Sequence, residues 1–268
     1  MITSQQTGLY YEVVGEGSPV VLVHAGIADS RMWDRQWMTF PRSHRVVRYD
    51  MRGFGRSPLA PGRYAPPADL IGLLEELALG PVALVGASMG GGISLQVAVA
   101  RPDLVAALVL VGSGVRGHEW SEYVTRSWAE EEAAFERGDL DAAVEVNLRT
   151  WVDGPDRSPD DVDPEVRQKV GEMQRRALEL YAEGGAGAEE EALVLDIGDR
   201  LGEISVPTLV LVGELDVADM HTVADRLEQE ILGARRATLE GVAHIPSLER
   251  PGEFDELVLG FLADVEAA

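Results

Sequence analysis

A serine flanked by very small residues is the strongest chemical signal in the chain. Residues 86–90 read Gly-Ala-Ser-Met-Gly, directly after the apolar run 82–85 and directly before a stretch with helical spacing. A serine on such a sharp strand-to-helix turn has strained backbone angles and crowded surroundings, so its neighbours must be small. We therefore predict that Ser88 is a catalytic nucleophile. The alternative is a glycine-rich turn that contains serine by chance.

A serine hydroxyl is a poor nucleophile at neutral pH and needs a base within hydrogen-bond reach. The chain has five histidines, and His244 is the one that lies in a turn between the last predicted strand and the last predicted helix. Such a turn reaches over the C-terminal edge of a parallel sheet, where ligands bind in open α/β folds. His244 is therefore the predicted base, with an ordinary surface histidine as the alternative.

An acidic residue is needed to orient the histidine, and three follow the apolar run 208–212. We predict that Asp216 has this role, because Glu214 falls close to the strand end. Asp219 is expected to cap a helix that begins at Met220. A role in turn formation or helix capping is the alternative for Asp216.

Backbone amides near the serine would have to stabilise a negatively charged oxygen during acyl transfer. Met89, the residue after the nucleophile, is one predicted donor. The other is Gly26 in the loop His24-Ala25-Gly26-Ile27-Ala28, whose small residues let the backbone approach a substrate oxygen. An ordinary strand-to-helix turn is the alternative interpretation of this loop.

Seven short, apolar runs must supply the strands that position these residues. Most are apolar on both faces, which is typical of a mostly parallel sheet covered on both sides by helices and predicts an α/β fold. Helical spacing predicts helices over 68–79, over 89–100 and from Pro251 onward. The predicted strands are 9–14, 20–23, 46–49, 82–85, 104–111, 208–212 and 236–239.

Residues 114–201 interrupt this alternation of strands and helices. They are rich in Glu, Ala, Arg and Trp with helical periodicity, contain no convincing strand, and include a glycine-rich stretch over 184–191 that we interpret as a loop. We predict a helical cap over 114–201, inserted in a core formed by 1–113 and 202–268. Aromatic residues of this cap could line an apolar pocket, or could simply pack against the core: Trp120, Trp128, Phe135, Trp151 and Tyr181.

Composition limits the possible partners. The 46 acidic and 23 basic residues give a net charge of −23, which repels phosphate backbones and anionic membrane surfaces, so neither nucleic acid nor a membrane is an expected partner. The chain has no cysteine and no histidine pair with metal-ligand spacing, so we predict no metal and no cofactor. The absence of a leader-like or membrane-spanning apolar segment makes a cytoplasmic protein the expectation. Oligomeric state cannot be read from the sequence.

Five segments together resemble the α/β-hydrolase superfamily, across nearly the whole chain. They also have the chain order Ser, Asp, His that is typical of this superfamily. The resemblance implies a supporting role beside the active site for Asp50, Arg52, Gly53, Gly55 and Ser57. One departure is Ala25, where the family usually has glycine. The segments are 20–26, 49–57, 86–91, 213–216 and 241–244.

Within this superfamily the chain is similar to the capped, cofactor-free group that contains carboxylesterases, 3-oxoadipate enol-lactonases and C–C bond hydrolases. The resemblance implies a serine hydrolase that cleaves a small-molecule ester or lactone through an acyl-enzyme, with Ser88, His244 and Asp216 as triad. Two alternatives stay open. One is a perhydrolase, C–C hydrolase or lyase that uses the same triad, and the other is a non-catalytic ligand-binding protein on this scaffold.

Overall fold

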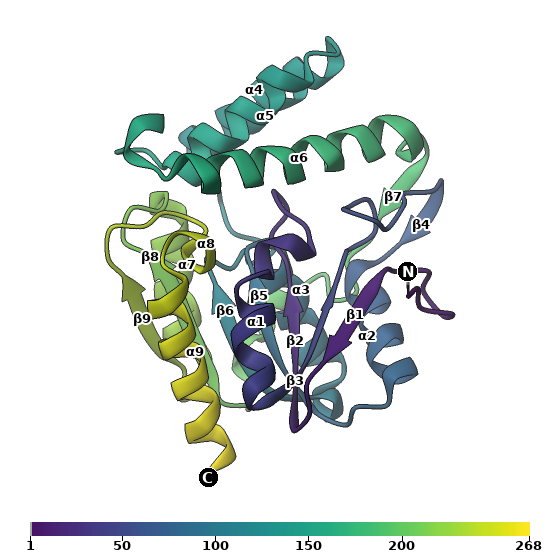
Figure 1. Cartoon of the computed structure of the whole chain (residues 1–268), viewed down its shortest axis with the longest axis vertical. Coiled ribbons are helices and arrows are strands. Elements are labelled where there is room, and N and C mark those ends of the chain that lie inside the picture. The colour runs from purple at the N-terminus through teal and green to yellow at the C-terminus, as the bar shows by residue number, and fades with distance from the viewer. Residues whose placement is uncertain (1) are drawn as a thin grey trace.

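A seven-stranded sheet forms the centre of the molecule (Figure 1). The computed structural model describes residues 2–268. Strand order is β1-β3-β2-β5-β6-β8-β9; β1 pairs antiparallel with β3, and all other pairs are parallel. The predicted α/β class is confirmed, and each of the seven predicted strands lies in this sheet. The strands are β1 (Tyr11–Val14), β2 (Ser18–Val23), β3 (His44–Tyr49), β5 (Val82–Ala87), β6 (Val105–Val111), β8 (Thr208–Gly213) and β9 (Arg235–Leu239).

Helices cover both faces of the sheet, which is why its central strands are apolar throughout. Every residue of β5 and β8 is buried. Helices α1 and α9 contact one another in front of the sheet in Figure 1, and α3 lies behind it with α2 packed against it. The helices of the core are α1 (Gln36–Thr39), α2 (Pro66–Leu77), α3 (Met89–Ala100), α7 (Ala218–Glu230), α8 (Pro246–Glu249) and α9 (Pro251–Glu266). Short 3-10 turns lie at Ser30–Trp33, Phe40–Arg42, Pro102–Leu104, Pro159–Asp161 and Ile197–Glu203.

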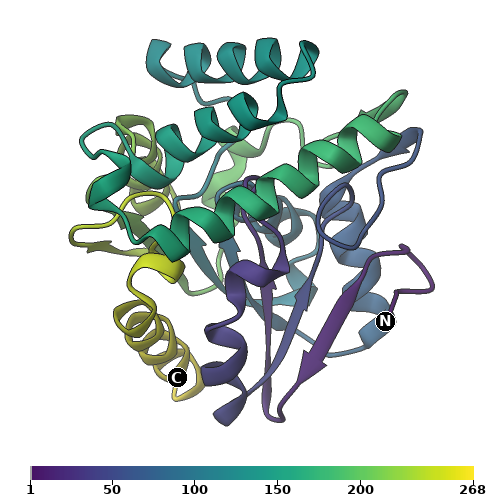
Figure 2. The ribbon, with the colours of Figure 1, turned by 45° about the horizontal axis from the view of Figure 1, so that its top comes forward.

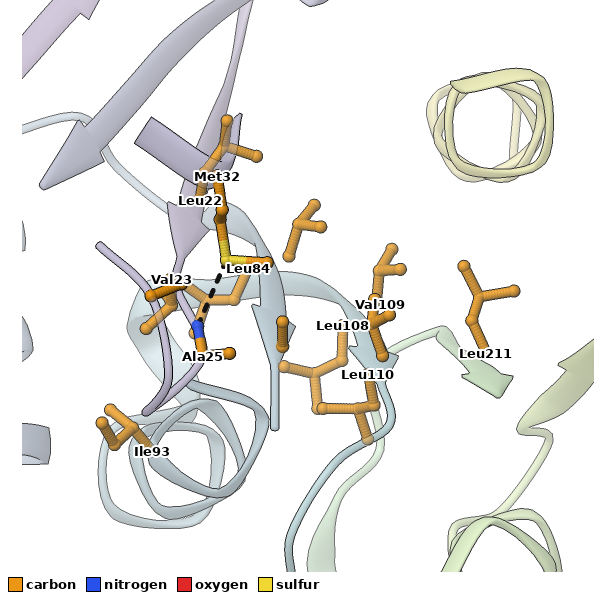
Figure 3. Close-up of a cluster of buried hydrophobic side chains, with 14 of the residues drawn as sticks. Leu22, Val23, Ala25, Met32, Leu84, Ile93, Leu108, Val109, Leu110 and Leu211 are labelled. Atoms are coloured by element: carbon orange, nitrogen blue, oxygen red, sulfur yellow. Dashed lines mark hydrogen bonds between the residues drawn. The ribbon is translucent and has the colours of Figure 1, made fainter. Parts of the chain in front are cut away.

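Leucines from neighbouring strands form the centre of the hydrophobic core (Figure 3). Leu22 of β2, Leu84 of β5 and Leu108 of β6 are fully buried. Ile93 of α3 belongs to the same continuous cluster. The core holds β5 between the apolar strands β2 and β6. The C-terminal end of β5 therefore has a fixed place at the C-terminal edge of the sheet.

A layer of three helices lies across this edge of the sheet (Figures 1 and 2). It follows β6 and contains α4 (Glu122–Glu136), α5 (Leu140–Asn147) and α6 (Pro164–Gly184), with a π-helical turn at Leu148–Asp153 after α5. We call residues 120–184 the helical layer. No helix within residues 2–268 is both long enough and apolar enough to cross a membrane.

A second, two-stranded sheet lies beside the helical layer (Figure 1). β4 (Gly62–Tyr64) pairs in parallel with β7 (Ala188–Glu190). The prediction of a loop over 184–191, and of no strand within 114–201, was therefore wrong at these three residues. A strand of three residues with two exposed glutamates has no apolar alternation from which it could be recognised. Its partner is distant in sequence, and Arg63 pairs with Glu189 across the two strands at 3.3 Å.

The loop after β2 is fastened by a fully buried histidine. His24 Nδ1 contacts the carbonyl oxygen of Ala25 at 2.8 Å, and His24 Nε2 lies 2.9 Å from the amide of Met51. A backbone carbonyl only accepts and a backbone amide only donates, so Nδ1 carries the proton, Nε2 accepts, and the ring is neutral. Burial lowers the pKa of His24, although the nearby Asp50 carboxylate opposes that shift. The neutral ring thus joins the loop after β2 to the loop after β3.

Acid should weaken the protein through His24. At a pH above about 6.5, the ordinary pKa of histidine, the ring is neutral in both the folded and the unfolded chain. Below it, the unfolded chain binds a proton that the folded chain excludes, so stability falls by up to about 1.4 kcal/mol per pH unit. We expect the free energy of unfolding, from urea titrations between about pH 7.5 and 5.5, to fall by about 1 kcal/mol more in the wild type than in His24→Gln. Equal slopes for the two proteins would contradict this linkage.

Candidate active site

Ser88 lies on a strained turn between β5 and α3. Its φ of 52° and ψ of −114° make it one of two residues other than glycine with positive φ in the part of the chain described. A Cβ atom at Gly86 would lie 2.5 Å from the carbonyl oxygen of Gly90, and a Cβ at Gly90 would overlap the carbonyl oxygen of Val23. Both flanking glycines are therefore required by backbone packing. The Ser88 amide donates to Val111 O at 2.8 Å, which fastens the turn to β6.

His244 and Asp216 form a buried pair at the ends of β9 and β8. His244 Nδ1 lies 2.8 Å from Asp216 Oδ2, and the two residues are only 3% and 5% exposed. The other oxygen of Asp216 accepts from the amide of Val217 at 2.8 Å. The Trp151 ring lies beside the imidazole with ring centroids 4.6 Å apart and a tilt of 40°, and the backbone carbonyl oxygen of Trp151 accepts from the His244 amide at 3.2 Å. This arrangement leaves Nε2 as the nitrogen available for proton exchange.

Ser88 and His244 line one cavity of about 360 Å³. Among residues 2–268 no hydrogen bond joins them, and contacts of this kind often tighten only when substrate is bound. Gly112, at φ 48°, lies close beside the histidine: a Cβ there would be 3.0 Å from His244 Nδ1 and 3.3 Å from Asp216 Oδ2. The space beside the pair therefore depends on a residue without a side chain.

The two other carboxylates after β8 are used elsewhere. Glu214 accepts from the amide of Gly241 at 2.8 Å. The prediction that Asp219 caps a helix beginning at Met220 was wrong, because α7 begins at Ala218 and Asp219 lies within its first turn. The carboxylate of Asp219 instead accepts from the amide and the hydroxyl of Ser121, at 2.8 and 2.6 Å. It therefore fastens the start of the helical layer to the core.

The loop after β2 places Gly26 beside the first residue of α3. Met89 begins α3, so its amide is one of those that a helix leaves unpaired. A Cβ at Gly26 would lie 3.1 Å from Met89 Cε, and both residues line the cavity with Ser88. Ala25 is fully buried, and its amide donates to Met32 Sδ at 3.3 Å, the dashed contact in Figure 3. The methyl group that replaces the usual glycine hydrogen thus packs in the core, away from the cavity.

The segment after β3 supports this loop. Asp50 Oδ1 accepts from the amide of Ser30, and Oδ2 accepts from the amide of Arg56, both at 2.8 Å. Ser57 Oγ donates to Asp50 O at 2.7 Å.

Arg52 makes two contacts with Asp69, at 2.9 and 2.8 Å. Gly53 and Gly55 have positive φ, and the Asp50 carboxylate leaves no room for a Cβ at Gly55. None of these residues lines the cavity that holds Ser88.

The helical layer supplies about half of the cavity wall. Of the five aromatic residues for which lining a pocket and packing against the core were both left open, three line this cavity, while Phe135 and Tyr181 contact each other with ring centroids 5.5 Å apart. Three polar residues were not predicted, because single polar residues in a helix give no sequence signal. The layer contributes Trp120, Trp128, Glu131, Asn147, Trp151 and Gln174, and the core contributes Gly26, Ile27, Ser88, Met89, Gly114, Met220 and His244. Within residues 2–268 no group of three or more His, Asp or Glu side chains is placed to hold a metal ion.

Comparison with known proteins places this geometry among hydrolases. The chain is 24% identical to 3-oxoadipate enol-lactonase 1 of Acinetobacter baylyi, over 99% of this chain and 97% of the relative. It is 28% identical to the pimeloyl-[acyl-carrier protein] methyl ester esterase of Aeromonas hydrophila, over 94% and 98%. The solved structure of a thermophilic esterase from Thermogutta terrifontis superposes with a TM-score of 0.81 at 28% identity, over 98% of this chain and 97% of that one. Residues 20–257 match the sequence model of the alpha/beta hydrolase family, and the chain belongs to that family.

Proposed function

We propose that the protein is a serine hydrolase that cleaves a small-molecule ester or lactone through an acyl-enzyme. The observation that carries this proposal is the strained turn at Ser88 beside the buried pair of His244 and Asp216, around one cavity. Relatives named as an enol-lactonase and an ester esterase support it. The cavity volume of about 360 Å³ is in the range of small-ligand sites.

Each residue of the site has one role in this reaction. Ser88 Oγ attacks the substrate carbonyl carbon while its proton passes to His244 Nε2, and Asp216 stabilises the ring cation and holds its orientation. The Met89 and Gly26 amides stabilise the oxyanion. As the tetrahedral intermediate collapses, the bond to the alcohol oxygen breaks and His244 returns the proton to that oxygen. Water then attacks the acyl-enzyme with its proton moving to His244, and the acid leaves as Ser88 recovers its proton.

Residues 114–201 are proposed to act as the cap of this enzyme, on a core formed by 1–113 and 202–268. The cap would exclude water from the cavity and would set the size and polarity of the substrate. This division is supported by the position of the helical layer over the sheet edge and by its share of the cavity wall (Figure 2). We propose a small molecule as the partner, since the net charge of −23 opposes phosphate backbones.

Replacing the nucleophile should abolish turnover without unfolding the protein. For Ser88→Ala we expect kcat on p-nitrophenyl esters, lactones and enol-lactones to fall by about 10³-fold or more. A fluorophosphonate probe should add to the wild type and not to the variant, as measured by mass spectrometry. The control is Ser43→Ala, which removes an exposed serine and should keep both properties. Activity of Ser88→Ala within about tenfold of the wild type would refute the proposal.

Filling the space at Gly112 should impair the pair of His244 and Asp216. Gly112→Ala adds a methyl group 3.0 Å from His244 Nδ1, so we expect kcat/KM for an ester to fall by about tenfold or more. The matched control is Gly80→Ala, since Gly80 also has positive φ, 76°, but a Cβ there meets nothing within 4 Å. Both substitutions add a backbone strain of about 1 kcal/mol, to be measured as the change in urea midpoint. Equal losses of kcat/KM in the two variants would show that strain alone is responsible.

A further inference from the structure

Three polar side chains line the catalytic cavity from the side of the helical layer. Glu131 belongs to α4, Asn147 ends α5 and Gln174 lies in α6, so each helix of the layer contributes one. We call these three residues the polar cluster. The other residues that the layer contributes to the cavity are tryptophans. A polar group placed in an otherwise aromatic wall determines which ligands can be oriented there.

Hydrogen bonding within the polar cluster leaves acceptors unused. Gln174 Nε2 donates to Glu131 Oε1 at 3.2 Å, which fixes the orientation of the Gln174 amide. Its Oε1 is buried without a hydrogen-bond partner among the described residues, and Gln174 is only 5% exposed. Asn147 uses its Nδ2 to donate to the carbonyl oxygen of Ala143 at 3.2 Å. A buried acceptor without a donor costs free energy, so the cluster is short of donors.

The polar cluster is also acidic without a compensating cation. No ion pair within residues 2–268 involves Glu131, and neither Lys nor Arg lines the cavity. Burial raises the pKa of the Glu131 carboxyl, although the amides of Asn147 and Gln174 oppose the shift. An uncompensated carboxyl in this position repels a ligand carboxylate and attracts a donor or a cation.

A purely structural role explains these contacts poorly. To join three helices, amide side chains could pair with one another and leave no acceptor empty. Here Gln174 Oε1 is unpaired and a carboxyl lies half-buried in the wall of the cavity. A ligand that brings donors would satisfy both groups.

We propose that the polar cluster selects substrates that carry a hydrogen-bond donor at the end of the acyl chain remote from the scissile carbonyl. The donor can be a hydroxyl, an amide N–H or an ammonium group. The cluster rejects substrates that carry a carboxylate at that end. This inference rests on the proposed function and narrows it to a substrate class. Glu131 accepts the donor and Gln174 Oε1 supplies a second acceptor, whereas the tryptophans contact the apolar part of the substrate.

The test compares p-nitrophenyl esters of four six-carbon acids: hexanoic, 6-hydroxyhexanoic, 6-aminohexanoic and adipic acid, the last as its monoester. In the wild type we expect kcat/KM for the ammonium ester to exceed that for the carboxylate ester by about tenfold or more, the low end for a hydrogen bond to a charged group. In Glu131→Gln this ratio should fall by about tenfold, and the preference for the hydroxyl ester over hexanoate should fall with it.

Glu132→Gln is the matched control, because Glu132 is the exposed neighbour of Glu131 on the same helix. It removes the same charge from the surface and should leave all ratios unchanged, which separates a local contact from the general attraction of an acidic protein for cations. Hydrolysis of the hexanoate ester by Glu132→Gln at the wild-type rate shows that loss of one surface charge leaves fold and catalysis intact, and each ratio compares substrates within one variant.

Two results would overturn the inference, and they are distinguishable. In the first, the wild type hydrolyses the hexanoate ester, but kcat/KM for the ammonium and carboxylate esters differs by less than about threefold, or Glu132→Gln shifts their ratio as much as Glu131→Gln does. Selection by the polar cluster is then wrong, while the proposed hydrolase activity stands. If folded wild type hydrolyses none of the four esters, the proposed function falls and the inference falls with it.

Discussion

The close approach of α3 to β2 is the constraint on which the site depends. The carbonyl oxygen of Val23 lies where a Cβ of Gly90 would be, so helix and strand can meet only because Gly90 has no side chain. This contact holds the first turn of α3 against the sheet, directly after Ser88, whose strained conformation can persist only where the surrounding structure is fixed. It also brings the start of α3 beside the loop that contains Gly26. One backbone contact thus positions both the proposed nucleophile and the proposed oxyanion donors.

The sequence predicted most of the core because its signals are local. The apolar runs at β5 and β8 show that both faces of the sheet are covered, and Pro251 begins α9 as expected. Asp216 and His244 could be paired from sequence since each follows a strand that ends at the same edge. Asp219 could not be interpreted in this way. Its partner, Ser121, is 98 residues away, and a contact over that distance leaves no local pattern.

The helical layer is the part that sequence predicts least well, and Glu131 shows why. It stands between Glu130 and Glu132 in a run of three glutamates. Glu130 pairs with Arg149 on the surface and Glu132 is exposed, yet Glu131 is half-buried and lines the cavity. The three residues are chemically identical, but helical spacing separates them, because Glu131 lies four residues after Ser127 and three before Ala134, both on the buried face of α4. What the spacing does not show is that this face meets a cavity, which depends on how α4 packs over the core.

The small β4 and β7 sheet has a consequence for the order in which the chain folds. Its strands are far apart in sequence, with Tyr64 and Glu190 separated by 126 residues. Closing so long a loop costs chain entropy that three residue pairs with exposed charges do not recover by themselves. We therefore expect the sheet to form after the core has brought its two strands together. On this argument, the segment that leads back from the helical layer is attached to β4 only once the core has folded.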